Sequence, residues 1–167
     1  LGIALGTLAR AGRDKLTLSL SPGIERFGAW IEQLVAESTG KAGRGLLPIV
    51  EEGLFETARY ADDRVFVDLA LADDAERSKR GQRLDALARA GHPVVRLELA
   101  DALELGAAVF QWEMATAVIG AVLGVNPFDQ PDVEAAKEAA RARMAERGSS
   151  ERGTRAEERA VASRDGI

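Results

Sequence analysis

The sequence predicts an α/β layer fold with a largely parallel sheet. Short apolar runs typical of strands alternate along the chain with longer stretches that have helical periodicity. Strands and helices in this order form βαβ units with right-handed crossovers, and the helices pack on the faces of the sheet. The predicted strands are residues 15–21, 45–50, 64–71 and 93–99.

The chain opens with a helical pattern that ends at Gly12. Its apolar positions share one side of a helix: Leu1, Leu5, Leu8 and Ala9. This segment has no basic start and is too short to cross a bilayer, so it predicts neither a signal peptide nor a membrane span. Because the first residue is not Met, we expect this chain to be a fragment of a longer one.

Two further helices are predicted between the strands. The first runs from Pro22 to about Ser38, with Ser21 as a candidate N-cap. The second covers residues 74–90, is highly charged and ends at Gly91. The apolar stripe of the first of these helices consists of Ile24, Phe27, Ile31, Leu34 and Val35.

Residues 103–123 are apolar on nearly every side of a helix. Glu104, Gln111 and Glu113 interrupt the segment, and ionised groups are costly in hydrocarbon, so we favour a helix buried in protein over a membrane span. A subunit interface is an alternative place for this helix. Beyond Met144 the apolar periodicity is lost, which favours a disordered tail over residues 148–167.

Composition excludes several kinds of site. The chain has 167 residues, enough for one domain with its own core. It contains no cysteine, which excludes disulfides, zinc-thiolate sites and a cysteine nucleophile, and its single histidine excludes a multi-histidine metal site. The net charge of −5, with both signs interspersed, disfavours nucleic acid or an anionic membrane as the main partner.

Two polar residues on the helix after Pro22 form a first candidate site. Gln33 and Glu37 are four residues apart and share a face away from the apolar stripe. Glu37 lies in the predicted last turn, near the negative end of the helix dipole, which suits a carboxylate that accepts protons. The alternative is a solvated glutamate on a polar helix face.

A second candidate site lies near the C-terminus. Gln130 and Lys137 are two helical turns apart, so the amide and the ammonium lie on one side of a helix in which Pro131 would be the first residue. An ammonium there could donate to a substrate oxygen or stabilise developing negative charge. The alternative is a surface lysine paired with Glu134.

These two segments resemble the two signatures of phosphoglucose isomerases (glucose-6-phosphate isomerases). Residues 37–41 read Glu-Ser-Thr-Gly-Lys, similar to the family's E-S-x-G-K segment, and Gln33 precedes them. Residues 128–137 are similar to the C-terminal F-D-Q-x-x-V-E-x-x-K signature. Residues 124–131 resemble in particular the isomerase part of bifunctional transaldolase/phosphoglucose isomerase proteins. The resemblance covers roughly residues 13–140.

The resemblance implies a sugar isomerase (SIS) fold, a three-layer α/β/α sandwich with a mainly parallel sheet and C-terminal helices. Residues 1–125 would be the second of two such domains, truncated at its N-terminus, and residues 126–147 the active-site turn and helix. The implied reaction interconverts glucose 6-phosphate and fructose 6-phosphate through a cis-enediol, in glycolysis and gluconeogenesis, in the cytoplasm and without a metal or cofactor. The implied partners are the hexose phosphate, an upstream SIS domain and, as an option, further copies in a homo-oligomer.

The resemblance also assigns a role to each candidate residue. Glu37 matches the base that moves a proton between C1 and C2, and Lys137 matches the lysine associated with ring opening and substrate positioning. Gln33 and Gln130 match glutamines that line the sugar site. These roles suit the chemistry, because a carboxylate can remove a proton next to a carbonyl and amides orient hydroxyls without adding charge.

Some parts of the family's site have no match in this chain. The ring-opening histidine of an H-Q-G motif is missing, and we expect His92 to be a loop residue. The phosphate loop and arginine of the first SIS domain are also missing, and residues 19–23 fit a plain turn better than a phosphate cradle. We therefore expect the parent protein to isomerise hexose phosphate and this chain alone to be inactive or nearly so. The alternative is a non-catalytic SIS-type module that binds a phosphosugar and acts as a regulator.

Overall fold

Parallel strands form one sheet in the order β2-β1-β3-β4 within residues 1–130 and 133–145, the part of the chain that the computed structural model describes. All three strand pairs are parallel, and β1 pairs with β3 from Lys15 opposite Arg64 to Leu20 opposite Leu69. Each strand predicted from the sequence is present. The strands are β1 (Lys15–Leu20), β2 (Leu47–Ile49), β3 (Arg64–Leu71) and β4 (Val94–Leu99).

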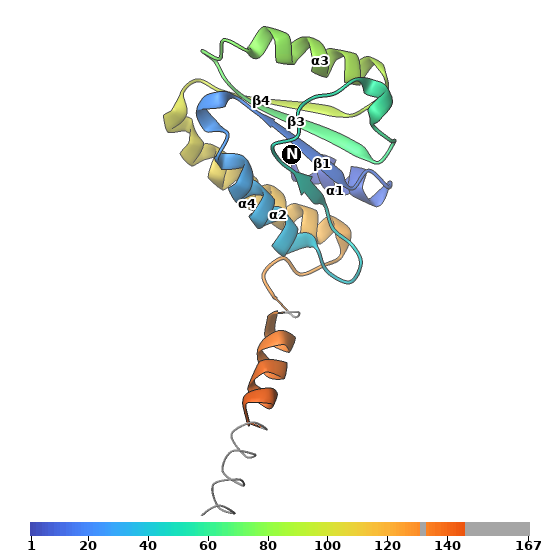
Figure 1. Cartoon of the computed structure of the whole chain (residues 1–167), viewed down its shortest axis with the longest axis vertical. Coiled ribbons are helices and arrows are strands. Elements are labelled where there is room, and N and C mark those ends of the chain that lie inside the picture. The colour runs from blue at the N-terminus through green and yellow to red at the C-terminus, as the bar shows by residue number, and fades with distance from the viewer. Residues whose placement is uncertain (131–132, 146–167) are drawn as a thin grey trace, which may run out of the picture. The chain divides into compact units, whose positions relative to one another are not determined.

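Helices cover both faces of this sheet, which confirms the predicted α/β/α layers (Figure 1). The helices are α1 (Gly2–Arg10), α2 (Phe27–Thr39), α3 (Arg77–Arg89) and α4 (Leu105–Leu123). Helices α1, α2 and α4 pack on one face of the sheet, and α3 packs on the other. Short 3-10 turns occupy Pro22–Ile24, Thr57–Arg59 and Ala102–Glu104. The predicted tail over residues 148–167 lies outside the described residues.

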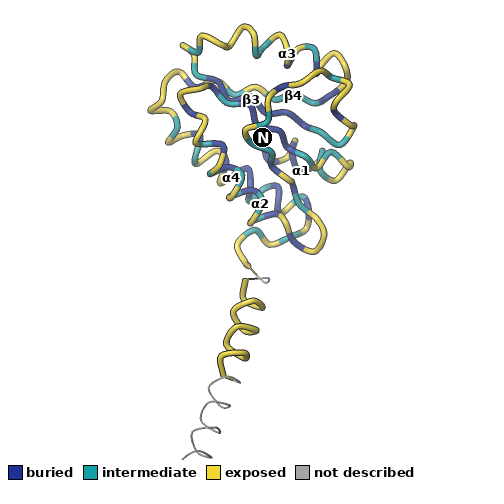
Figure 2. The backbone as a smooth tube through the Cα atoms, viewed as in Figure 1, coloured by how far each residue is buried: buried dark blue, intermediate teal, exposed yellow. Residues whose placement is uncertain are grey.

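The core lies on both faces of β3, whose residues from Val65 to Ala70 are all buried. Val65 and Val67 contribute to the cluster formed with α1, α2 and α4, whereas Phe66 packs with Leu84 and Leu87 of α3. Figure 2 shows the central strands buried between the two helix layers. A strand covered on both faces has an almost continuous apolar sequence, which is why β3 could be found from the sequence.

The helix predicted from Pro22 begins later than expected. A 3-10 turn over Pro22–Ile24 comes first, and α2 starts at Phe27. Ser21 occupies the N-cap position of the 3-10 turn, but its side chain does not cap it, because the hydroxyl donates to the Asp74 carboxylate at 2.7 Å and accepts the Leu71 N–H at 2.9 Å. The side chain of Ser21 instead joins the carboxyl ends of β1 and β3.

The same end of the sheet holds a buried charge cluster. The Arg80 guanidinium donates to the Asp68 carboxylate at 2.7 Å and also forms an ion pair with Asp74. The side chains of Arg80, Asp68 and Asp74 are 11%, 8% and 2% exposed. Burial opposes ionisation of Asp74, but the hydrogen bond from Ser21 and the pairing with Arg80 outweigh it and hold the pKa of the Asp74 carboxyl below its usual value.

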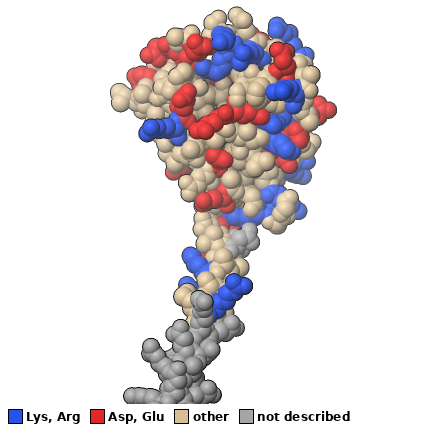
Figure 3. All heavy atoms as spheres, in the orientation of Figure 1, with Lys and Arg blue, Asp and Glu red and all other residues tan. Residues whose placement is uncertain are grey.

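Charges on the solvent side of α3 pair with those of the neighbouring strand. Arg77 forms an ion pair with Glu98, and Asp85 accepts from Arg96 at 2.5 Å. These four side chains are about half exposed, so each pair contributes little to stability. Figure 3 shows Lys, Arg, Asp and Glu side chains interspersed on the visible face of the molecule.

Only one side of α4 is buried, although the sequence predicted a buried helix. Trp112 and Ile119 are fully buried, whereas Phe110 and Met114 are exposed. The segment Ala102–Leu123 is long and apolar enough to cross a membrane by length and composition, and 33% of its most apolar window is buried in the protein. An interface role for this helix stays a prediction.

We predict that Arg80→Met lowers the free energy of unfolding by about 3–5 kcal/mol, because it leaves the carboxylates of Asp68 and Asp74 buried without their cation. Urea denaturation followed by circular dichroism measures this change. Arg96→Met is the control, since it removes a half-exposed pair and should cost at most about 1 kcal/mol. Equal losses in the two variants would contradict the structural role of the cluster.

We predict that Asp74 makes the fold sensitive to acid. Its folded-state pKa is lowered, so the ionised carboxylate adds stability above the unfolded-state pKa of about 4, and this stability is lost as pH falls through the folded-state pKa. Urea midpoints measured between pH 7 and pH 3 should therefore fall less steeply for Asp74→Asn than for the wild type. Asp73→Asn, an exposed neighbour, should keep the wild-type slope.

Candidate functional site

The first candidate pair lies on the exposed side of α2. The Gln33 side-chain amide donates to Glu37 Oε1 at 3.2 Å, and both residues are exposed. Ile31 and Val35 occupy the buried side of the same helix. The shared face predicted for Gln33 and Glu37 is therefore confirmed, and one carboxylate oxygen of Glu37 is held by the neighbouring amide.

The end of α2 is fixed by a buried hydroxyl. Thr39 Oγ1 donates to the Val35 carbonyl at 2.7 Å and accepts the Leu46 N–H at 3.1 Å. Gly40 follows as the C-cap, with its N–H bonded to the Ala36 carbonyl at 2.9 Å. Thr39 thereby connects the last turn of the helix, which carries Glu37, to the segment that enters β2.

A tight turn follows the helix. Lys41 and Arg44 exchange two backbone hydrogen bonds of 3.0 and 2.9 Å, and the two residues between them, Ala42 and Gly43, have φ values of 53° and 70°. Positive φ at both central positions is the geometry of a type I′ turn. This geometry costs about 1–2 kcal/mol for a residue with a Cβ such as Ala42, so contacts around the turn must favour it.

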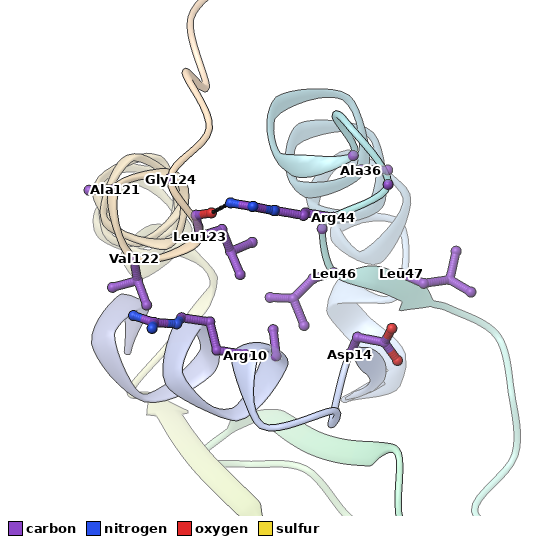
Figure 4. Close-up of a pocket in the computed structure, with 14 residues that line it drawn as sticks. Arg10, Asp14, Ala36, Arg44, Leu46, Leu47, Ala121, Val122, Leu123 and Gly124 are labelled. Carbon is purple, nitrogen blue, oxygen red and sulfur yellow. Dashed lines mark hydrogen bonds between the residues drawn. The ribbon is translucent and has the colours of Figure 1, made fainter.

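The two cations of this turn contact the chain at and beyond the end of α4. The Lys41 ammonium donates to the Asn126 carbonyl at 2.5 Å, to the Asp129 carbonyl and to the Asp129 carboxylate at 2.9 Å. Arg44 donates to the Leu123 carbonyl at 2.9 Å (Figure 4). The structure thus brings the Glu-Ser-Thr-Gly-Lys segment into contact with the Asn-Pro-Phe-Asp segment.

Sequence reasoning missed these contacts of Lys41 and Arg44. Sequence patterns placed Lys41 in a motif but assigned it no role of its own, and they assigned no role to Arg44. A signal was nevertheless present, because basic side chains just beyond a helix end often bind the unpaired carbonyls of a helix C-terminus. The sequence could not show that these carbonyls belong to the end of α4 and to the segment beyond it.

Gln130 and Lys137 belong to a second compact unit that begins at Gln130, whereas the first unit comprises Leu1–Asp129. In the second unit, residues 133–145 are helical, and the Glu134 N–H donates to the Gln130 carbonyl at 3.1 Å. The Lys137 ammonium pairs with the Glu134 carboxylate at 2.7 Å, which is the surface pair considered above as the alternative. Pro131 lies outside the described residues.

His92 lies on the other face of the sheet from α2. Its ring packs edge-on against Phe66 and Tyr60, with centroid distances of 5.6 and 6.1 Å, and it is 7% exposed. Nδ1 has no hydrogen-bond partner among the described residues. This position in the aromatic cluster beside α3 separates His92 from Glu37.

A hollow of about 930 Å³ opens beside the turn after α2. Arg10, Asp14 and Arg44 are its charged lining residues, and the Arg44 side chain crosses it to reach Leu123 (Figure 4). It lies at the edge of the sheet where β1 and β2 begin. Within the described ranges, no group of three or more His, Asp or Glu side chains could hold a metal ion.

Curated proteins similar to this chain carry the name glucose-6-phosphate isomerase. The one from Enterococcus faecalis is 30% identical in an alignment that covers 78% of this chain and 37% of that protein. The one from Rubrobacter xylanophilus is 31% identical in an alignment that covers 88% of this chain and 43% of that protein. The chain spans about two fifths of the length of the curated relatives it matches.

The fold is also found among solved structures. The crystal structure of hypothetical protein TT0462 from Thermus thermophilus matches with a TM-score of 0.66 at 20% identity, over 87% of this chain and 45% of that one. At this identity the likeness concerns the fold alone. No protein-family model matches the chain.

We predict that Thr39→Val destabilises the end of α2, because it leaves the buried Leu46 N–H without its acceptor. The expected loss is about 1–3 kcal/mol of unfolding free energy, measured by urea denaturation. Thr39→Ser keeps the hydroxyl and should lose less than Thr39→Val. A larger loss for the serine variant would show that the methyl group, and not the hydrogen bonds, stabilises this end of the helix.

Proposed function

This chain is related to the glucose-6-phosphate isomerase family, and we propose that it supplies the proton-transfer part of such an isomerase site. The observation that carries the proposal is the arrangement around the end of α2. There the Glu37 carboxylate is exposed and accepts a hydrogen bond from Gln33. Lys41, four residues further on, contacts the segment that leads to Gln130. The reaction interconverts glucose 6-phosphate and fructose 6-phosphate.

In this proposal Glu37 is the base. It removes the proton from C2 of the open-chain aldose, the C2 electron pair forms the C1–C2 double bond, and the C1 carbonyl oxygen becomes a hydroxyl as it takes up a proton. The resulting cis-enediol receives the proton from Glu37 at C1, and the C2 hydroxyl releases its proton to solvent, which replaces the solvent proton taken up by the C1 oxygen, so that the carbonyl forms at C2. Because the Gln33 amide donates to Oε1, the second oxygen of Glu37 stays available for the carbon-bound proton.

The second unit contributes the polar groups that act on the sugar oxygens. Lys137 would donate to the ring oxygen during ring opening, and Gln130 would orient a sugar hydroxyl without adding charge. Lys137 must leave its surface pair with Glu134 to do so, which costs little because both side chains are more than half exposed. The phosphate would be held by the part of the parent protein that corresponds to the remaining length of the relatives.

The proposal includes the finer expectations drawn from the sequence. These are an SIS-type domain that acts with an upstream SIS domain, fusion to a transaldolase, and a location in the cytoplasm. None of the reaction steps above uses a metal or an organic cofactor, since a carboxylate, an ammonium and two amides supply the proton transfers and the orientation. The proposal therefore needs only the hexose phosphate as a partner in the reaction.

We predict that Glu37→Gln in the parent protein lowers kcat for fructose 6-phosphate isomerisation by about 10²- to 10⁴-fold, because an amide cannot accept the C2 proton. A coupled assay that detects glucose 6-phosphate measures the rate. Glu32→Gln is the matched control on the same helix, since Glu32 lies about 140° around the helix axis from Glu37. It should keep near wild-type kcat.

The same assay separates this proposal from a phosphosugar sensor. A parent protein that binds the sugar phosphate without turnover, and whose binding is unchanged by Glu37→Gln, would be a regulator and would contradict the proposal. The 167-residue chain alone should show little or no turnover. Isomerisation by this chain alone, abolished in Glu37→Gln, would contradict the division of the site between this chain and the rest of the parent.

A further inference from the structure

The ammonium of Lys41 is almost completely enclosed, and its residue is 9% exposed. An ammonium group has three N–H donors. In Lys41 the three acceptors are the Asn126 carbonyl, the Asp129 carbonyl and the Asp129 carboxylate. All the donors are therefore used within the protein, and none is free to bind a substrate.

These acceptors belong to a segment that is otherwise weakly held. Pro127 packs closely on α4, since a Cβ added at Gly120 would lie 2.8 Å from Pro127 Cδ. Beyond it, Phe128 is 84% exposed and Asp129 is also exposed, so apolar burial contributes little there. The Phe128 N–H bonds only locally, to the Asn126 side chain at 3.1 Å. Among the residues that the structure describes, Lys41 thus makes the long-range polar contacts that hold residues 126–129.

The segment held by Lys41 leads directly into the second unit. Asp129 is bonded to Gln130, the first residue of the unit that carries Lys137. Lys41 itself follows the last turn of α2, four residues after Glu37. The same ammonium therefore connects the helix that carries the proposed base to the point where the chain continues to the other proposed site residues.

We propose that Lys41 is a positioning residue of the isomerase site, which fixes residues 126–129 at the end of the helix that carries Glu37. This inference rests on the proposed function. Lys41 acts through Asp129 and the backbone and does not touch the substrate. Its removal should misplace groups that must align in the transition state, an error that can cost about 100-fold in rate without a large change in ground-state binding.

The test compares Lys41→Met with Arg44→Met in the parent protein. Both variants remove a cation of the same turn, but Arg44 binds the end of α4 at Leu123 and not residues 126–129. Hydrogen–deuterium exchange should become at least about 10-fold faster in peptides covering residues 124–130 for Lys41→Met, and near wild type for Arg44→Met. Circular dichroism and the urea midpoint check that each variant is folded.

The kinetic expectation for Lys41→Met is a fall of about 10- to 100-fold in kcat, with KM within about 2-fold of wild type. Lys41→Arg, which keeps the charge, should recover part of both the exchange protection and kcat. Unchanged exchange in Lys41→Met would overturn the anchoring role, and faster exchange with unchanged kcat would overturn the positioning role. A wild-type parent without isomerase activity would instead overturn the proposed function, whatever the exchange comparison showed.

Discussion

The contact between the Lys41 ammonium and residues 126–129 is the interaction on which the candidate site depends. It joins Lys41 to Asn126 and Asp129, which lie 85 and 88 residues further along the sequence, and so connects the end of α2 to the chain beyond α4. Thr39 ties the turn that carries Lys41 to the helix, and Arg44 binds the Leu123 carbonyl at the end of α4. The Arg44 contact satisfies a carbonyl that the end of α4 leaves unpaired, so this hydrogen bond stabilises a helix terminus and also brings distant segments together.

The topology explains why these segments meet. α2 follows β1, α4 follows β4, and both helices pack on the same face of the sheet. A helix that follows a parallel strand runs back along the sheet, so both helices end near the amino ends of the strands. Glu37 therefore lies at the amino ends of the strands, whereas open α/β sheets commonly bind ligands at the carboxyl ends. The fold alone would not have indicated this position, and the sequence signatures were needed to find it.

Local patterns predicted the strands and the helix layers well, because most buried positions of β1 and β3 are apolar. These local patterns failed where a residue distant in the sequence forms a hydrogen bond with a side chain that was expected to bond to its near neighbours. Ser21 fits an N-cap by its position, but Leu71 and Asp74, 50 and 53 residues further on, take its hydroxyl. They also failed on α4, since a helix that is apolar all round does not reveal that Phe110 and Met114 face outwards. Lys41 could be placed in a motif but not matched to its partners.

Two cations enclosed by the fold, Arg80 and Lys41, differ in what their partners do. Arg80 binds two buried carboxylates, and its partners lie within β3 and the segment between β3 and α3, so the cluster stabilises the packed sheet itself. Lys41 binds two backbone carbonyls and a carboxylate that is 52% exposed, in a segment that adds little to the core. We therefore expect this contact to matter more for where that segment lies than for folding. Because three acceptors converge on a compact ammonium, and a planar guanidinium presents its donors differently, an arginine could replace this lysine only in part.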